Sequence, residues 1–250
     1  MKKIITAVAI FVFSFTANYC FGEIQPESNT DSGVDPVLER ELNNIGISST
    51  VFTRDTSDFR DGDFKLSEKI AKAIMSDNLF RSDPEIQKNL KQTISDNKTL
   101  LFPWSNTGIA RLARDNDNLV AELYQVSNED TSISQSITFK SANASIKFDL
   151  TPVKTNSDDK LEVLISTFDA SGQPQEIILA SYQLSDFSGN KHIEVDLYGN
   201  KKFAENLREL KNSAGGYESM VDVVFRLQGN KNKDNPTIIH LGNFKISYIY

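Results

Sequence analysis

Cysteine and histidine are scarce in this sequence, and basic residues are outnumbered by acidic ones. The 250 residues include one Cys and two His, which is too few for a zinc site built from Cys and His or for a disulfide framework. Lys and Arg number 27 against 34 Asp and Glu, so the formal net charge is -7. Because binding to phosphate backbones needs a basic surface, nucleic acid is not expected as a partner.

Motifs of the common catalytic sites are also missing from the sequence. It contains no P-loop, no dinucleotide-binding fingerprint and no G-x-S-x-G nucleophile elbow. His192 and His240 are far apart, and a catalytic triad would need one of them beside an activated Ser, so we interpret both as strand-face residues. Acidic pairs such as Glu194 and Asp196 could serve a glycosidase, but 34 acidic residues produce such pairs by chance. We therefore assign no catalytic residue and no cofactor, and favour a binding protein over an enzyme.

Long apolar runs are confined to the N-terminus. Two lysines precede residues 4–15, which are apolar apart from one Thr and one Ser. A run of this length is typical of a signal peptide and is too short to span a bilayer comfortably. Cleavage after Gly22 would remove residues 1–22 as the signal peptide. No other segment approaches transmembrane length, so no transmembrane segment is expected.

Cys20 raises the alternative of a lipoprotein. A lipobox needs a Leu-like residue three positions before the Cys and a small residue directly before it, whereas Ala17 and Tyr19 stand there. An ordinary cleaved signal fits these residues better. Because the Met-Lys-Lys start and the short apolar run look bacterial, we expect an exported protein, either periplasmic or secreted.

Three segments with different apolar patterns follow the N-terminal run: residues 23–34, 35–97 and 98–250. Residues 23–34 are polar and without periodicity, which predicts a disordered tether. Residues 35–97 predict a helical N-terminal region, in which Ile86, Leu90 and Ile94 repeat every four residues. Two short helices cannot bury such a face alone, so we expect them to dock on the remainder of the protein.

Residues 98–250 predict a β-sandwich domain. Val221, Val223 and Phe225 recur at every second position, and turn signals separate eight or nine strands of this kind. One short helix is expected at residues 201–212. The expected fold class is therefore mostly β: an antiparallel jelly-roll β-sandwich with an N-terminal helical extension.

The last strand contains a change of parity. Ile239 and Leu241 are odd-numbered, whereas Phe244 and Ile246 are even-numbered, so the inward-facing set slips by one residue between them. A one-residue slip requires a β-bulge, and Gly242 is the residue in that interval that tolerates one most readily. We therefore expect Gly242 to occupy the bulge with a positive φ.

Five features follow one another along the sandwich region. They are Trp104, GIARLAR at Gly108–Arg114, TSISQSITF at Thr131–Phe139, LEVLISTFDASG at Leu161–Gly172 and IHLGNFKISY at Ile239–Tyr248. In this order they resemble the galactose-binding-like jelly rolls, which include several carbohydrate-binding-module families. The resemblance implies a sandwich that binds glycans, although jelly rolls host unrelated functions. The family's last strand often carries an acidic pair before its apolar run; Gly242-Asn243 stands there instead, so the resemblance supplies no calcium site.

Aromatic and cationic side chains of the sandwich are the ligand-binding candidates. An exposed aromatic ring offers a flat apolar face to a sugar, and Tyr198 follows Leu197 on an alternating strand, so it should point outward. Trp104 either offers such a face or plugs the end of the sandwich. Arg111 could bind acidic groups or belong to a solvated strand face. The full candidate set is Trp104, Arg111, Tyr124, Tyr182 and Tyr198.

The spacing of Asp61-Gly62-Asp63 and Glu68 resembles that of a calcium-binding EF-hand loop. With Gly62 at the sixth position of the loop, Glu68 falls at the twelfth, as calcium ligation requires. The same register places Phe59 at the third ligand position, where Phe cannot bind a cation. A turn leading into a helix capped by Ser67 explains the same residues. If the loop binds calcium instead, the candidate ligands are Asp61, Asp63 and Glu68.

Two functions of different classes remain open. The leading hypothesis is an exported, non-catalytic binding protein whose sandwich recognises a glycan or another surface ligand. The alternative is a periplasmic or secreted interaction protein whose helices and sandwich edge dock on a protein partner, and a hydrolase ranks third because no motif supports it. Outward aromatics gathered on one sheet would favour the first hypothesis. A flat apolar patch rimmed by polar residues would favour the second.

Overall fold

The computed structural model describes most of the chain. The described residues are 36–47, 57–95, 101, 103–126, 130–169, 171–213, 220–229 and 234–249. The signal peptide expected at 1–22 and the tether expected at 23–34 lie outside them. No helix of the described part is long and apolar enough to cross a membrane.

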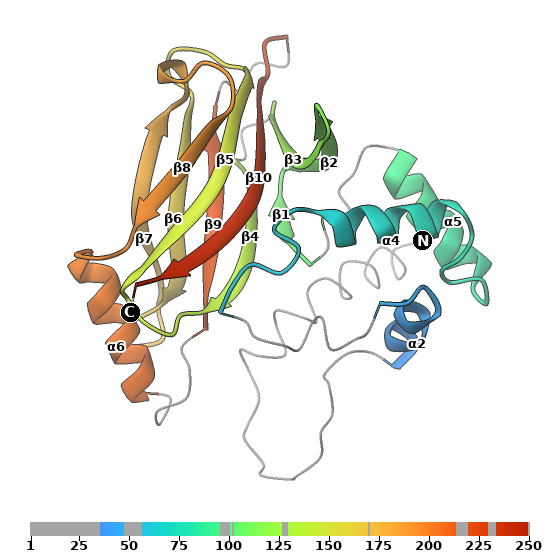
Figure 1. The fold of residues 1–250 in the computed structure, drawn as a ribbon, viewed down its shortest axis with the longest axis horizontal. Helices are drawn as coiled ribbons and strands as arrows, with labels where there is room; N and C mark the ends of the chain where they lie inside the picture. The colour runs from blue at the N-terminus through green and yellow to red at the C-terminus, as the bar shows by residue number, and fades with distance from the viewer. Residues whose placement is uncertain are drawn as a thin grey trace.

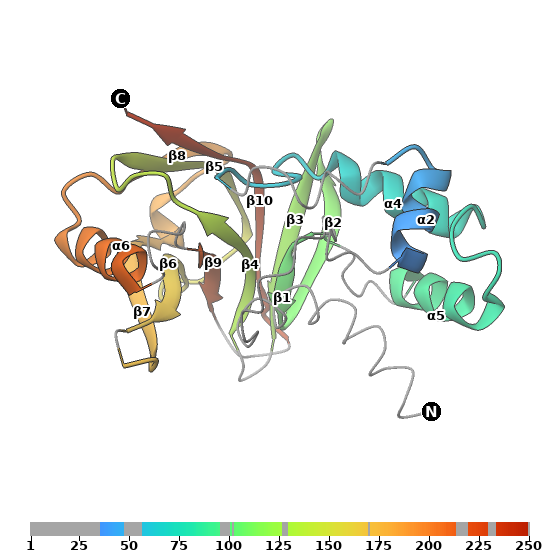
Figure 2. The same ribbon diagram turned by 90° about the horizontal axis from the view of Figure 1, so that it is seen from below.

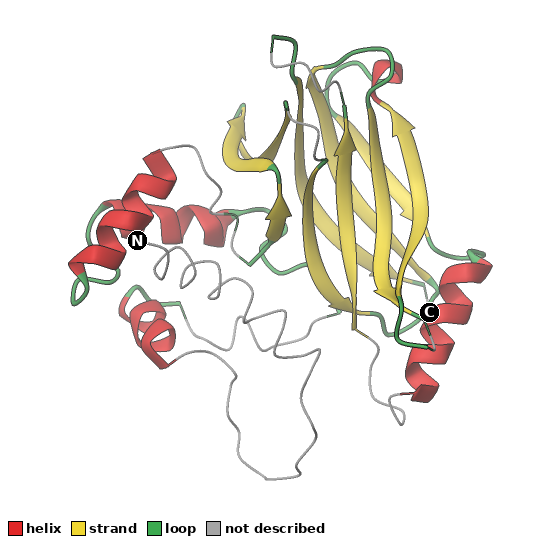
Figure 3. Cartoon of the chain, turned by 180° about the vertical axis from the view of Figure 1, so that it is seen from behind, coloured by secondary structure: helices red, strands yellow, loops and turns green. Residues whose placement is uncertain are grey.

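Two antiparallel sheets, each with five described strands, form a sandwich (Figure 1; Figure 3). The first sheet comprises, in spatial order, β1 (Ser105–Thr107), β4 (Thr131–Thr138), β9 (Met220–Gln228), β6 (Lys160–Phe168) and β7 (Pro174–Gln183). The second comprises β2 (Ile109–Asp115), β3 (Asn118–Gln125), β10 (Thr237–Tyr248), β5 (Ala144–Lys154) and β8 (Lys191–Asp196). The expected fold class, a mostly β antiparallel jelly-roll sandwich with N-terminal helices, is confirmed.

Alternation along the strands decides which side chains fill the space between the sheets. In β9, Val221, Val223 and Phe225 are buried, while Asp222 and Arg226 are partly exposed on the outer face. The other long strands supply further buried Ile, Leu and Phe side chains to one continuous core. Burying such a side chain contributes about 1.5–3 kcal/mol, so this core is the main stabilising feature of the sandwich.

The helix α6 (Lys201–Ser213) covers one end of the sandwich, as Figure 1 shows. It begins after Asn200, whose Oδ1 accepts a hydrogen bond from the backbone N–H of Phe203 (3.0 Å). The ring of Phe203 then packs edge-on against Phe139 in the core, with centroids 5.1 Å apart. The helix expected at residues 201–212 is therefore confirmed.

Three helices at the other side have a small core of their own. They are α2 (Pro36–Asn44), α4 (Lys65–Met75) and α5 (Pro84–Ser95), and Figure 2 shows them beside β2 and β3. Their shared core contains Leu42, Ile47, Ile70, Ala73, Ile74, Leu79 and Leu90, with the expected partners Ile86 and Ile94 packed against it. The side chain of Glu41 on α2 accepts a hydrogen bond from the backbone of Phe80 (2.7 Å), which ties α2 to the loop between α4 and α5.

The segment of residues 57–64 completes the sandwich on the side where β3 begins. The pairing of β10 with β3 stops at Leu241. Beyond that point the free edge of β10 is covered by this segment, because Phe244 N–H donates to the Gly62 carbonyl (3.0 Å) and Ile246 N–H donates to Asp58 Oδ1 (2.7 Å).

The same segment also reaches the first sheet. The side chain of Gln135 on β4 accepts a hydrogen bond from the Arg60 N–H (2.6 Å) and donates one to the Arg60 carbonyl (3.0 Å). Phe59 and Phe64 belong to the continuous core of the sandwich. That core therefore begins well before residue 98, where we expected the sandwich domain to start.

The parity slip in β10 is a β-bulge. Gly242 lies opposite Asp149 of β5 and Lys245 lies opposite Lys147, so β10 has one residue more than β5 in this interval. The side chains of Leu241 and Phe244, on either side of the slip, are both buried. The expected bulge is confirmed.

The positive φ within the bulge belongs to Asn243 and not to Gly242. Asn243 has a φ of 54°, a conformation that Asn tolerates better than most residues. The expectation of a positive φ at Gly242 was wrong. Gly242 instead lies where a side chain would have little room, because a Cβ there would lie 3.3 Å from Val120 Cγ1 and 3.4 Å from the Leu119 carbonyl oxygen.

Candidate functional site

Trp104 lies in the core and cannot offer its ring to a ligand. Its residue surface is 3% exposed, and the ring centroids of Phe244 and Phe59 are 4.6 Å and 5.2 Å from its own. Its Nε1 donates a hydrogen bond to the Asp61 carbonyl (3.3 Å). The plug interpretation is therefore confirmed, and the role of Trp104 as a ligand platform is wrong, because other aromatic rings cover the indole.

The two tyrosines of the β7–β8 region differ in exposure. Tyr182 on β7 packs on the core, with its ring 6.4 Å from Phe148 and 5.9 Å from Phe187. Burial raises the pKa of the Tyr182 hydroxyl. Tyr198 points outward as expected and is 67% exposed. It lies in the turn after β8, two residues beyond Asp196, and its N–H donates to Asp196 Oδ1 (2.8 Å).

Arg111 and Tyr124 share the outward face of the second sheet. Arg111 lies opposite Glu122 in the register of β2 and β3, and Tyr124 is two residues from Glu122, so the three side chains point to the same side. The Nε of Arg111 donates to Glu122 Oε1 (2.5 Å). The structure thus brings together two of the five expected ligand residues and separates the other three.

Glu122 is held between Arg111 and His240 of β10. The His240 Nε2 lies 3.1 Å from Glu122 Oε2. The hydrogen bonds from His240 and Arg111 hold the pKa of Glu122 below its ordinary value, against the effect of burial. The other ring nitrogen of His240 is buried and lies 3.6 Å from Asp115 Oδ2, beyond hydrogen-bond distance. Four titratable or charged groups from three strands therefore form one row.

A small hollow opens beside this row at the bulge of β10. Its volume is about 10 Å³, room for about one water molecule. Asp149 on β5 forms part of its wall, with one carboxylate oxygen 2.9 Å from His192 Nδ1 and the other accepting from Asn243 Nδ2 (2.6 Å). The lining residues are Asp115, Asn118, Val120, Asp149, Thr151, Asn190, His240, Gly242 and Asn243.

We call the row and the hollow together the polar face of the second sheet. Its polar residues are Arg111, Asp115, Asn118, Glu122, Tyr124, Asp149, Thr151, Asn190, His192, His240 and Asn243. The sequence analysis missed most of them as site residues. Asp149 and His240 each stand between two buried residues of their strand, so alternation indicated that both point outward, but nothing local indicated that they lie close together.

The calcium candidates are engaged with donors of the protein. Asp61 caps α4: its carboxylate accepts hydrogen bonds from the backbone N–H groups of Leu66 and Ser67 (2.7 Å each) and from the Ser67 hydroxyl (2.6 Å). Burial raises the pKa of Asp61, although these hydrogen bonds oppose the shift. The expectation that Ser67 caps this helix was wrong, because Ser67 lies inside α4 and donates to the capping residue.

Asp63 and Glu68 have cationic partners. Asp63 pairs with Lys65 (2.6 Å), and Glu68 pairs with Lys72 (3.0 Å) and with Arg114 of β2. The hydrogen bond from Lys72 is the main cause that holds the pKa of Glu68 below its ordinary value. Within the described residues, no three His, Cys, Asp or Glu side chains gather as a metal-binding group.

Comparisons with known proteins found similar structures but no sequence relatives. No family model and no curated protein matches the chain. Solved structures similar to it include TmCBM61 in complex with β-1,4-galactotriose (9% identity, TM-score 0.37, 59% of this chain and 90% of that one). They also include the CBM22-1 xylan-binding domain of Paenibacillus barcinonensis Xyn10C (14% identity, TM-score 0.39, 58% of this chain and 85% of that one).

A third similar structure is the family 11 carbohydrate-binding module of Clostridium thermocellum with a mixed-linked tetrasaccharide (13% identity, TM-score 0.36, 58% of this chain and 88% of that one). Carbohydrate-binding-module sandwiches are therefore among the structures that this chain resembles, as its sequence indicated. At such identities and TM-scores no residue role passes from those modules to this chain.

Proposed function

We propose that the protein binds a glycan on the polar face of the second sheet without catalysing a reaction. The observation that carries this proposal is that residues from four strands of one sheet, β2, β3, β5 and β10, line a hollow at the bulge. His192 of β8 joins them through its contact with Asp149 (2.9 Å). Glu122, Asp149 and Asn243 are held by hydrogen bonds before any ligand arrives. Such preorganised groups lose less conformational freedom on binding.

The chemistry of this face suits a polyhydroxylated ligand. Sugar hydroxyl groups both donate and accept hydrogen bonds; carboxylates such as Asp115 and Asp149 accept them, and amides such as Asn190 and Asn243 do both. Tyr124 adds an aromatic ring on the same side. Because the hollow admits about one water, the glycan would lie along the sheet, with one hydroxyl group directed into the hollow.

The location and the cofactor requirement are part of the same proposal. The signal-peptide pattern of residues 1–22 supports export to the periplasm or the medium of a bacterium. Binding would need no cofactor, since the polar face uses side-chain hydrogen bonds, and calcium at Asp61, Asp63 and Glu68 would play no part.

A glycan array with the protein lacking residues 1–22 tests the proposal, followed by calorimetric titration of the ligand found. Asp149→Ala should weaken binding about tenfold or more, because charge-assisted hydrogen bonds are lost. Glu176→Ala, on the outward face of the first sheet, is the matched control and should leave affinity unchanged. An array without a bound glycan, equal effects of the two variants, or release of sugar fragments from the bound glycan would each overturn the proposal.

A second candidate function rests on the outward face of the first sheet. Val224, Leu164 and Ile178 lie in one row across β9, β6 and β7, and Leu164 in the middle of the row is itself buried. Ile178 is 54% exposed, and Phe168, on the same face, is 46% exposed. An apolar patch of this kind is typical of protein-binding surfaces. If a protein partner rather than a glycan is the ligand, Ile178→Lys should abolish its capture while Asp149→Ala should not.

A further inference from the structure

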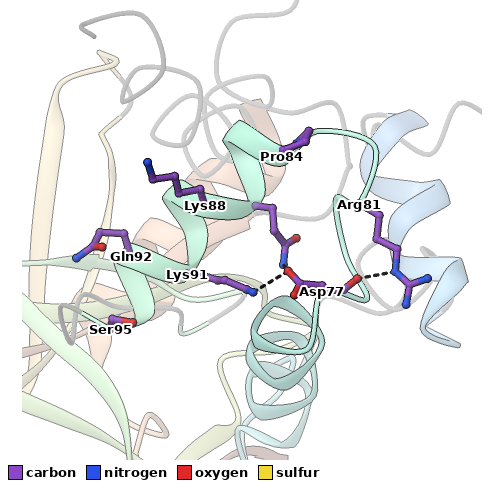
Figure 4. A pocket seen from close by; sticks show the side chains of 8 residues that line it. Asp77, Arg81, Pro84, Lys88, Lys91, Gln92 and Ser95 are labelled. Atoms are coloured by element: carbon purple, nitrogen blue, oxygen red, sulfur yellow. Dashed lines mark hydrogen bonds and ion pairs between the residues drawn. The ribbon is translucent and has the colours of Figure 1, made fainter.

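The helical region contains a hollow that is unrelated to the polar face of the second sheet. It runs along α5 and the loop that joins α4 to α5 (Figure 4) and has a volume of about 640 Å³, within the range of small-molecule sites. Its lining residues are Asp77, Arg81, Pro84, Gln87, Lys88, Lys91, Gln92 and Ser95. Seven of these eight side chains end in a polar or charged group, so the hollow suits a ligand that forms hydrogen bonds, and the aliphatic parts of the Lys, Arg and Gln side chains add apolar contact.

Positive charge dominates the hollow, although the whole chain carries a net charge of -7. The one acidic lining residue, Asp77, is neutralised by Lys91 at 2.7 Å, and the hydrogen bond from Lys91 holds the pKa of Asp77 below its ordinary value. Arg81 is fixed at the rim by a hydrogen bond from its Nε to the Asp77 carbonyl (2.5 Å). Lys88 is exposed and, within the described chain, has no ion-pair partner. A net positive charge is therefore left for a ligand.

Gln87 is a buried polar side chain in the lining of the hollow, and it has unused hydrogen-bonding capacity. Its residue surface is 7% exposed. Its Nε2 donates to the Ile74 carbonyl and to Asp77 Oδ1 (2.8 Å), which fixes the orientation of the amide. The amide oxygen is buried and has no hydrogen-bond partner. An unpaired buried acceptor is unfavourable, so a hydroxyl group that reached it would be stabilised.

We propose that this hollow binds an anionic saccharide: a sugar unit that carries a carboxylate or a phosphate beside free hydroxyl groups. Lys88, with Arg81 at the rim, attracts the anionic group, and a hydroxyl donates to the Gln87 oxygen once the flexible lysine side chains have moved aside. A bare anion would make no hydrogen bond to that oxygen, and a neutral sugar would gain nothing from the charges of Lys88 and Arg81. The site is separate from the polar face and does not depend on the function proposed there.

Two-dimensional amide NMR of the protein lacking residues 1–22 tests this inference with four probes. These are a galacturonic acid oligomer, a galactose phosphate, a neutral galactose oligomer and acetate. Shifts of the amides of residues 77–95 should saturate with one or both of the anionic sugars. The neutral oligomer and acetate should bind there at least about tenfold more weakly. The comparison of the two anionic sugars identifies the anionic group.

A pair of matched variants locates the site. Lys88→Gln should weaken the anionic sugar about tenfold, whereas Lys202→Gln, which removes an exposed charge of α6, should not. Asp149→Ala should also leave this binding intact, so failure of the glycan proposal is distinguishable from failure here. Absence of shifts in residues 77–95, equal binding of acetate, or equal effects of the two Lys variants would overturn the inference.

Discussion

The ring of Trp104 stacks on that of Phe59, with centroids 5.2 Å apart and planes inclined by 11°. Trp104 precedes the first strand, and Phe59 belongs to the segment that precedes α4. The Trp104 indole also donates to the Asp61 carbonyl, and the Asp61 side chain caps α4. These contacts join the core of the sandwich to the start of the helical hairpin.

Removing Phe59 from this stack should destabilise the sandwich. Phe59→Ala is expected to lower the free energy of unfolding by about 3–5 kcal/mol, as for a buried aromatic truncation. Phe168→Ala, at a half-exposed position of β6, should lower it much less. A fragment of residues 98–250, which lacks Phe59 and Phe64, should unfold at lower denaturant than a fragment of residues 36–250. Equal midpoints for the two fragments would show that residues 57–64 are dispensable.

The bulge of β10 predicts an order of alanine effects. Asn243→Ala should cost about 1 kcal/mol or more, because Ala is disfavoured at a φ of 54° and the bond to Asp149 is lost. Gly242→Ala places a Cβ 3.3 Å from a Val120 methyl group, a contact that a small shift relieves. Asn243→Gly keeps the backbone conformation and isolates the lost side-chain bond. Denaturant melts that rank Gly242→Ala as the more damaging change would contradict this assignment.

Beyond the bulge, neighbouring positions of β10 should differ sharply. Phe244 is 5% exposed and contacts four aromatic rings of the core besides Trp104. Phe244→Ala should therefore cost about 3–5 kcal/mol. Lys245 points to solvent, so Lys245→Ala should change the free energy of unfolding by less than about 0.5 kcal/mol. Comparable losses for the two variants would mean that the register of β10 is different.

Acid should weaken the polar face through Glu122. Its pKa lies below the ordinary value of 4.5, because His240 and Arg111 stabilise the carboxylate. A lowered pKa contributes stability above the ordinary value and loses it as the pH falls through the folded-state pKa. The stability difference between the wild-type protein and Glu122→Gln should thus shrink between about pH 5 and pH 3. Glu205→Gln, at an exposed position of α6, is the control. A stability difference between the wild-type protein and Glu122→Gln that increases as the pH falls would contradict this prediction.

Calcium should leave the protein unchanged. The carboxylates of Asp61, Asp63 and Glu68 are engaged with a helix N-terminus and with lysines, so millimolar Ca²⁺ or a chelator should shift the melting temperature by less than about 1 °C. Asp61→Ala should instead lower stability by about 0.5–2 kcal/mol through loss of the cap. A rise of several degrees in the melting temperature on adding Ca²⁺ would support calcium binding and contradict this prediction.

Local periodicity in the sequence was enough to predict several elements. The four-residue repeat of Ile86, Leu90 and Ile94 predicted α5, because residues four apart lie on one face of a helix. Two-residue alternation predicted β9, because successive strand residues point to opposite faces. The parity slip predicted the bulge of β10 for the same reason. Tyr198 is exposed as expected, but it lies in the turn after β8 and not on the alternating strand.

The tertiary structure alone decided which distant residues meet. His240 contacts Glu122 across 118 positions of sequence, and this pairing follows from the order of strands in the sheet, which periodicity does not encode. The burial of Trp104 likewise depends on Phe59 and Phe64 arriving from the segment before α4. In the bulge, the parity of the strand fixed the extra residue, but only the tertiary structure shows that Asn243 takes the positive φ and that Gly242 lies close to Val120.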